Sequence, residues 1–193
     1  MAAHICPVWI GYLLASPLRK LIQNPKIVKP YLENGMTVVD FGSAMGYFSI
    51  PMAKMVGRSG KVICVDVQER MLKVLQKRAA RAGVSDRIIP HLSTEEGIDL
   101  DDHKKKIDFI LASAVLHETP DPDRTLQELS ALLKPGATFM LIEPKGHVGE
   151  EEFERIKALA IKFGLHLSAQ PHVARSRTAL FIKEEMNRPE SAV

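Results

Sequence analysis

Three observations predict an α/β fold built on a mostly parallel β-sheet. Apolar runs suited to strands buried on both faces alternate along the chain with segments of helical periodicity. The first run leads directly into a glycine-containing turn and a helix start, within residues 36–50. The chain has 193 residues, 46% of them hydrophobic, which is enough for one sizeable domain but rarely for two. We therefore expect one α/β domain with helices on both faces of its sheet.

Seven segments are expected to form strands, because each is apolar and is bounded by turn or helix signals. They are residues 37–41, 61–65, 87–92, 107–112, 138–142, 165–170 and 178–183. Pro90 has no backbone N–H to donate, so the third strand is expected at an edge of the sheet. The last two strands are joined by a loop so short that they must pair antiparallel.

Helical spacing of apolar residues predicts four helices between the strands. They are expected to begin near Tyr47, near Gln68, after Asp121 and before Phe153. Gly83 and Gly164 are expected to end the second and the fourth helix, because glycine adopts the backbone conformation that closes a helix. The Pro135–Gly136 pair is expected to close the third.

The turn within residues 36–50, MTVVDFGSAMGYFSI, indicates a nucleotide-type pocket. Gly42 and Gly46 bracket the turn, and they allow the backbone to reverse and a ligand to approach without meeting a Cβ atom. Ser43 and Ala44 lie between them. The helix that follows points its N-terminal amides at the same space.

Acidic residues stand at the ends of the first two strands. Asp40 interrupts the first apolar run, and a positive partner is expected because burying an unpaired carboxylate costs several kcal/mol. Asp66 follows Gly46 by twenty residues, the spacing at which an acid reaches the two ribose hydroxyls of a bound nucleoside. Capping of the helix that starts near Gln68 is the alternative role for Asp66, since Asp is a favoured N-cap.

Further polar side chains follow the third, fourth and fifth strands. Thr94 and Glu95 are positioned either to hydrogen-bond an adenine edge or to form an ordinary loop. His117, beside Glu118, is a candidate general base whose tautomer a carboxylate fixes, or else a capping or core histidine. Glu143 is a candidate substrate contact.

The composition excludes several classes of protein. A net charge of +3, with basic and acidic residues interspersed, is too mild for a nucleic-acid binder. Cys6 and Cys64 form neither a disulfide framework nor a zinc-ligand spacing, so no metal site and a cytoplasmic setting are expected.

Residues 1–34 are expected to form a cap or lid ahead of the domain at residues 35–184, with a flexible tail at 185–193. The segment HICPVWIGYLLASPL is apolar but too short to span a bilayer. It is interpreted as a helix that covers an edge of the core, as a lid with Trp9 and Tyr12 facing a substrate, or as an interfacial membrane contact.

Four stretches, VVDFGSAMG, KVICVDV, IDFILASAVLHE and LLKPGATFMLIE, resemble the class I S-adenosylmethionine-dependent methyltransferases over about residues 28–183. The resemblance is greatest to the branch that includes the ubiquinone and menaquinone methyltransferases. It implies a Rossmann-like seven-stranded sheet of order 3-2-1-4-5-7-6, with strand 7 antiparallel. It also implies methyl transfer from S-adenosylmethionine to a small, partly apolar metabolite by in-line displacement.

The resemblance assigns parts of the cofactor to residues of this chain. The methionine part is expected against residues 40–46, the ribose on Asp66, and the adenine near Thr94 and Glu95. The full set of expected cofactor contacts is Asp40, Gly42, Ser43, Ala44, Gly46, Asp66, Val67, Thr94, Glu95 and Ser113. His117 is the candidate catalytic base where the acceptor is a hydroxyl, thiol or ammonium group that must lose a proton.

This chain departs from the family pattern at two positions. Ala44 replaces the middle glycine of the usual GxGxG turn, and we expect that position to require a small side chain rather than a positive φ. Thr94 stands where the family often has Asp.

The alternative functions are a nicotinamide-dinucleotide oxidoreductase and an inactive S-adenosylmethionine-binding protein. The chain has no GK[ST] after its glycines, and its GxGxxG fingerprint is incomplete. Asp40 suits an ammonium group and would repel a pyrophosphate placed close to it.

Overall fold

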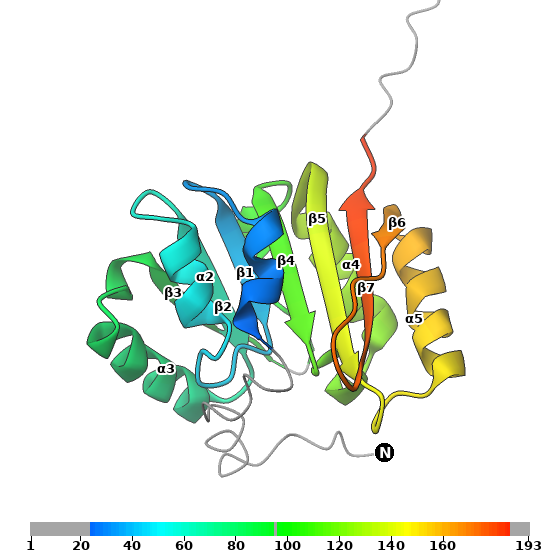
Figure 1. The fold of residues 1–193 in the computed structure, drawn as a ribbon, viewed down its shortest axis with the longest axis horizontal. Helices are drawn as coiled ribbons and strands as arrows, with labels where there is room; N and C mark the ends of the chain where they lie inside the picture. The colour runs from blue at the N-terminus through cyan, green and yellow to red at the C-terminus, as the bar shows by residue number, and fades with distance from the viewer. Residues whose placement is uncertain (1–23, 95, 186–193) are drawn as a thin grey trace, which may run out of the picture.

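A computed structural model describes residues 24–94 and 96–185 of the chain. Its seven strands form one sheet in the order β3-β2-β1-β4-β5-β7-β6 (Figure 1). The strands are β1 (Thr37–Phe41), β2 (Lys61–Asp66), β3 (Ile88–Leu92), β4 (Ile107–Ser113), β5 (Leu133–Pro144), β6 (Leu165–Ala169) and β7 (Ser176–Lys183). The first five pair in parallel, and β7 is antiparallel to both β5 and β6. The expected strand order and the edge position of β3 are both confirmed.

Helices cover both faces of the sheet, as expected (Figure 1). The α-helices are α2 (Ser49–Met55), α3 (Glu69–Arg81), α4 (Pro122–Leu132) and α5 (Glu150–Lys162), and short 3-10 helices lie at η2 (Pro25–Tyr31), η3 (Ser85–Arg87), η4 (Asp101–His103) and η5 (Leu116–Glu118). One core cluster joins η2, α2 and α3 to one face, and a second joins α4 and α5 to the other. No helix within residues 24–94 and 96–185 has the length and apolar character needed to cross a membrane.

The central strands are largely apolar because both of their faces are covered. In β1, Val38 packs in the cluster with α2 and α3, while its neighbour Val39 packs in the cluster with α4 and α5. In β4, Phe109 and Ile110 divide in the same way. After β1 the chain builds outward to β2 and β3, and then returns to place β4 on the other side of β1. The carboxyl ends of β1 and β4 therefore flank a topological switch point, where ligands of open α/β sheets bind.

One predicted helix boundary was wrong. Helix α4 ends at Leu132 and β5 begins at once, so the Pro135–Gly136 pair lies inside β5 rather than at the end of the helix. The pair sits in an irregularity of the β4–β5 ladder, where Leu133 pairs with Ile107 and the regular register resumes at Thr138. A proline and a glycine with a φ of +77° fit such a bulge. The first predicted helix begins at Ser49 with Phe48 as its N-cap, close to the expected start near Tyr47.

Candidate functional site

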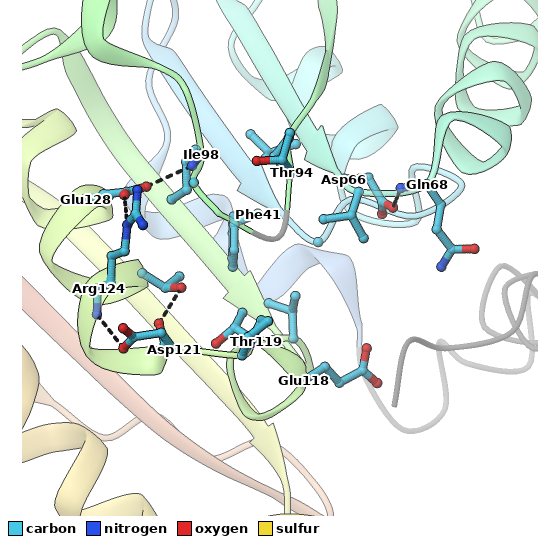
Figure 2. Close-up of a pocket in the computed structure, with 18 of the residues that line it drawn as sticks. Phe41, Asp66, Gln68, Thr94, Ile98, Glu118, Thr119, Asp121, Arg124 and Glu128 are labelled. Carbon is cyan, nitrogen blue, oxygen red and sulfur yellow. Dashed lines mark hydrogen bonds and ion pairs between the residues drawn. The ribbon is translucent and has the colours of Figure 1, made fainter. Parts of the chain in front are cut away.

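A pocket opens at the carboxyl ends of β1, β2 and β4 (Figure 2). The turn after β1 contributes Gly42 and Ala44, the end of β2 contributes Asp66 and Val67, the loop after β3 contributes Thr94 and Ile98, and the end of β4 contributes Ser113 and Ala114. Glu118 and the first turns of α4 complete the wall. Six of the ten predicted cofactor contacts line this pocket: Gly42, Ala44, Asp66, Val67, Thr94 and Ser113. Asp40, Ser43 and Gly46 lie outside the described lining, and Glu95 lies outside the described residues.

Asp66 lines the pocket and also organises the backbone around it. Its Oδ2 accepts a hydrogen bond from the N–H of Ala44 at 2.8 Å. Its Oδ1 accepts one from the N–H of Gln68 at 2.9 Å (Figure 2). Burial raises the pKa of Asp66, and the two backbone hydrogen bonds oppose that rise. Because a carboxylate has about four acceptor sites, both oxygens keep capacity for a ligand. The helix-start contact at Gln68 and a ligand contact are therefore compatible in one side chain.

Asp40 is not among the residues that line the pocket. It is 3% exposed, and its Oδ2 accepts a hydrogen bond from the hydroxyl of Ser49 at 2.5 Å. One partner of the Asp40 carboxylate is therefore a hydroxyl at the start of α2. The contact ties the end of β1 to the helix that follows the turn.

The two glycines of the turn serve its shape and packing. Gly42 has a φ of +73°, and a Cβ there would lie 2.4 Å from Cγ2 of Val115. Gly46 has a φ of +79°, and a Cβ there would lie 2.9 Å from Cγ of Leu75. The side chain of Val115 therefore occupies the volume that a side chain at Gly42 would need. That volume is not available to a ligand.

Ala44 adopts a φ of +45°, so the expectation that this position requires only a small side chain was wrong. The left-handed region costs a residue with a Cβ about 1–2 kcal/mol. Ala44 holds that conformation while its N–H donates to Asp66. The hydrogen bond that positions the acid thus comes from a strained residue.

Ala44→Gly is expected to stabilise the protein by up to about 1 kcal/mol, because the relief of left-handed strain exceeds the extra backbone entropy that glycine loses on folding. That gain corresponds to a rise in Tm of about 2–4 °C for a domain of this size. The matched control is Ala158→Gly, at an exposed position within α5, which is expected to destabilise by about 1 kcal/mol. Thermal unfolding of both variants checks the prediction, and a lowered Tm for Ala44→Gly would contradict it.

The loop after β3 is fixed to the pocket by groups distant in sequence. The N–H of Thr94 donates to the carbonyl of Gly97 at 3.2 Å. Glu128 of α4 accepts the N–H of Ile98 at 2.8 Å through Oε2, and Nε of Arg124 at 2.8 Å through Oε1 (Figure 2). Nε2 of His91 lies 2.6 Å from the carbonyl oxygen of Ile98. This loop is therefore held from both β3 and α4 at the predicted adenine position.

Ser113 ends β4 with an unsatisfied hydroxyl. The residue is 9% exposed, and its Oγ has no hydrogen-bond partner among the residues that the structure describes. The Oγ of Ser43, 4% exposed and outside the lining, is likewise without a partner there. An unpaired buried polar group costs about 1–3 kcal/mol, so a ligand that supplies the missing partner to Ser113 gains affinity. Ala114, the next residue, is a second lining alanine in the left-handed region, with a φ of +55°.

His117 belongs to a polar cluster beside the pocket. Its Nδ1 lies 2.6 Å from Oε2 of Glu143, which is fully buried and whose Oε1 accepts the N–H of Leu116 at 2.9 Å. Its Nε2 lies 3.2 Å from Nδ1 of His147 and 4.0 Å from Oε1 of Glu118. The carboxylate that orients the ring is therefore Glu143, at the end of β5, rather than the neighbouring Glu118. His117 itself adjoins the lining through Glu118.

The charges around His117 favour its protonated form. Burial alone would lower the pKa of His117, but the hydrogen bond and the charge of Glu143, with smaller contributions from Glu118 and Glu152, raise it above its usual value. Burial also raises the pKa of Glu118, against the opposing charge of His117. The cluster is thus an imidazole held in one orientation by a buried carboxylate, which is the arrangement of a general base.

The sheet order, the pocket at the β1–β4 switch point and the acid at the end of β2 define the class I methyltransferase architecture. Comparison with known proteins agrees: a family model described as "Methyltransferase domain" matches residues 32–177. The chain belongs to this family of methyltransferase domains. Membership of this family, together with the methyltransferase structures it resembles, implies S-adenosylmethionine as the cofactor.

Among curated proteins, the chain is similar to an arsenite methyltransferase of Aquipseudomonas alcaligenes, at 34% identity over 69% of this chain and 41% of that protein. It is also similar to the ubiquinone/menaquinone biosynthesis C-methyltransferase UbiE of Escherichia coli, at 28% identity over 58% of this chain and 44% of that protein. The chain therefore matches less than half the length of these relatives. A solved S-adenosylmethionine-dependent methyltransferase from Aquifex aeolicus superposes with a TM-score of 0.81 and 26% identity, covering 92% of this chain and 99% of that one.

The pocket fits S-adenosylmethionine, which carries a sulfonium and an ammonium against one carboxylate. Asp66 and Glu118 give the lining acidic character, and the unpaired hydroxyl of Ser113 provides a buried polar contact. Among the described lining residues the one cationic side chain is Arg124, which is engaged by Glu128. The pyrophosphate of a dinucleotide would be repelled by these acidic side chains, and the described lining lacks the lysine that many phosphate sites use.

Proposed function

We propose that the protein transfers a methyl group from S-adenosylmethionine to a small, partly apolar metabolite. The observation that carries this proposal is the pocket at the β1–β4 switch point, with Asp66 held by two backbone amides and the hydroxyl of Ser113 left unpaired. When bound, the cofactor supplies an electrophilic methyl group on a sulfonium. The protein's contribution is to hold the two reactants in line, which can supply up to about 7–11 kcal/mol of the barrier.

Each group of lining residues is proposed to bind a different part of the cofactor. Asp66 accepts hydrogen bonds from the ribose hydroxyls, while the turn from Gly42 to Ala44 and the hydroxyl of Ser113 hold the methionine end. Val67 and Thr94 contact the adenine. Asp40, Ser43 and Gly46 act on the cofactor through the shape of the turn, and Glu95 keeps its proposed place beside the adenine. His117 is the proposed general base, oriented by Glu143.

The acceptor is not expected to be arsenite, despite the name of one relative. A soft centre such as arsenic(III) is held by thiolates. This sequence has two cysteines, and Cys64, on β2, is fully buried in the core cluster that joins the sheet to η2, α2 and α3. Burial raises the pKa of its thiol, and the charge of Asp40 raises it further, so Cys64 is neither accessible nor a thiolate. An organic acceptor is therefore the better match.

The regions flanking the pocket complete the proposal. In the described part of residues 1–34, Val28 of η2 is fully buried against the core, which supports a capping role for the end of that segment. The lid interpretation of Trp9 and Tyr12 concerns residues outside those described. No nucleic-acid partner is proposed, because basic and acidic residues are interspersed, and the cytosol remains the proposed location.

Thermal stability with added ligand tests the choice of cofactor. S-adenosylhomocysteine at about 100 times its Kd is expected to stabilise the protein by about 2.7 kcal/mol, which is roughly 5–10 °C in Tm. NADH at the same concentration is expected to leave the Tm unchanged. A rise with NADH and none with S-adenosylhomocysteine would favour the oxidoreductase alternative. Methyl transfer to any acceptor of a metabolite panel separates an enzyme from an inactive binding protein.

A further inference from the structure

Three side chains form a polar path from the pocket to solvent. Glu118 lines the pocket, and its Oε1 lies 4.0 Å from Nε2 of His117. The same Nε2 lies 3.2 Å from Nδ1 of His147, an exposed residue in the loop between β5 and α5. The two imidazole rings meet edge to face, with centroids 5.2 Å apart. The path thus begins at the cavity wall and ends at the protein surface.

Glu143 determines which nitrogen of His117 takes part in this path. Its buried carboxylate accepts the Nδ1 proton of His117, which leaves Nε2 as the ring nitrogen that gains and loses a proton. The ionisable groups that face His117 come from four elements: Glu118 from η5, Glu143 from β5, Glu152 from α5 and His147 from the intervening loop. Three of the four are carboxylates, so a proton that arrives at Nε2 is stabilised there, and an anionic acceptor is disfavoured.

We propose that His147 is the proton exit of this site, and that the acceptor is an uncharged or cationic O–H, N–H or S–H group that loses its proton on methylation. The proposal rests on the methyl-transfer function proposed above. In the balanced step, the acceptor atom gives its proton, through the carboxylate of Glu118 at the pocket wall, to Nε2 of His117. The acceptor uses its lone pair to bond the methyl carbon, while the electrons of the broken C–S bond stay on sulfur. His117 then passes the proton to Nδ1 of His147, which releases one from Nε2 to water.

Because Nε2 of His117 contacts Nδ1 of His147, removing His147 is expected to slow the exchange of the Nε2 proton of His117 with water. NMR of the imidazole nitrogens of the full chain is expected to show this exchange slowed by about tenfold or more in His147→Gln. His166→Gln is the matched control: His166 is an exposed histidine on β6, paired with Glu184, and its loss should leave the exchange rate at His117 unchanged. An equal exchange rate in the wild type and in His147→Gln would overturn the proposal. This measurement needs no methyl acceptor, so it remains decisive in cofactor-free protein even if S-adenosylhomocysteine does not bind.

Turnover of paired probes provides the functional readout. Phenol must lose a proton on methylation, whereas the nitrogen of pyridine has a lone pair and no proton to lose. With S-adenosylmethionine, His147→Gln is expected to lower phenol methylation at least tenfold, free imidazole in the buffer is expected to restore it, and pyridine methylation is expected to be unchanged. A loss that is equal for both probes, or a phenol rate equal to that of the wild type, would show that His147 has a structural role or none.

Discussion

Glu143→Gln is expected to lower kcat/KM for a protic acceptor by about 10²–10⁴-fold. The carboxylate accepts the Nδ1 proton of His117 with one oxygen and the N–H of Leu116 with the other. A glutamine keeps its oxygen on the N–H of Leu116 and turns its NH₂ toward Nδ1. Nδ1 then becomes an acceptor, and the single ring proton moves to Nε2. In the neutral ring, Nε2 of His117 then already carries a proton and cannot accept another from the substrate. The shape of the site is nevertheless kept.

Two variants and a pH profile separate this effect from misfolding. His117→Gln, which removes the base but keeps an N–H donor for Glu143, is expected to lose as much activity. The Kd for S-adenosylhomocysteine should be unchanged in both variants. Because the pKa of His117 is raised above 6.5, the wild-type kcat/KM should increase as the pH rises through that shifted value. A Glu143→Gln enzyme with the wild-type rate would show that the Glu143–His117 pair has no part in catalysis.

Asp66→Asn is expected to weaken binding of S-adenosylhomocysteine by about ten- to a hundredfold, because hydrogen bonds to a charged group contribute about 1.5–3 kcal/mol. The carboxylate accepts the amides of Ala44 and Gln68 and is proposed to accept the ribose hydroxyls as well. An asparagine has one acceptor oxygen, so it cannot serve both amides and the ribose. Isothermal titration measures the change directly.

The matched control for Asp66 is Asp101→Asn, which neutralises an exposed acid on η4 that pairs with Lys104. It is expected to leave the Kd unchanged, so a general effect of net charge is excluded. Asp66→Asn is also expected to lower the Tm, since one backbone amide loses its acceptor. An unaltered Kd together with a lowered Tm would mean that Asp66 only caps α3 and holds the turn.

The sheet and the wall nearest β1 and β2 were predictable because their signals are local. Runs buried on both faces mark the central strands, and the spacing from Gly46 to Asp66 identifies the acid at the pocket. The alternation of strands and helices, with a closing hairpin, fits the observed topology. These features depend on residues close in sequence, so hydrophobic periodicity and turn residues are enough to predict them.

The features of the site that the sequence did not predict depend on contacts between residues distant in sequence. Nothing near Glu128 indicates that it holds the N–H of Ile98, thirty residues away, and the pairing of His117 with Glu143 across two strands has no local signal. Polar residues at the ends of neighbouring strands were the available clue to that pairing. The φ of Ala44 was missed because alanine is rarely found in the left-handed region.

Strain at the pocket is a feature that local rules do not anticipate. Ala44 and Ala114 both adopt positive φ angles and both line the cavity, on the turns that follow β1 and β4. Residues in this conformation persist where the surroundings determine the backbone, and they gather at ligand sites. Here the N–H of Ala44 bonds Asp66 and the N–H of Ala114 bonds the carbonyl of Ile142. The pocket edge is therefore preorganised before a ligand arrives.

The most direct measurement of the central claim is a crystal structure of the protein with S-adenosylhomocysteine. In that structure the ribose hydroxyls are expected on the carboxylate of Asp66, the adenine beside the loop that Glu128 holds, and the sulfur near the end of β4. Density for a diphosphate over the turn at Gly42, or product bound away from Asp66, would contradict it.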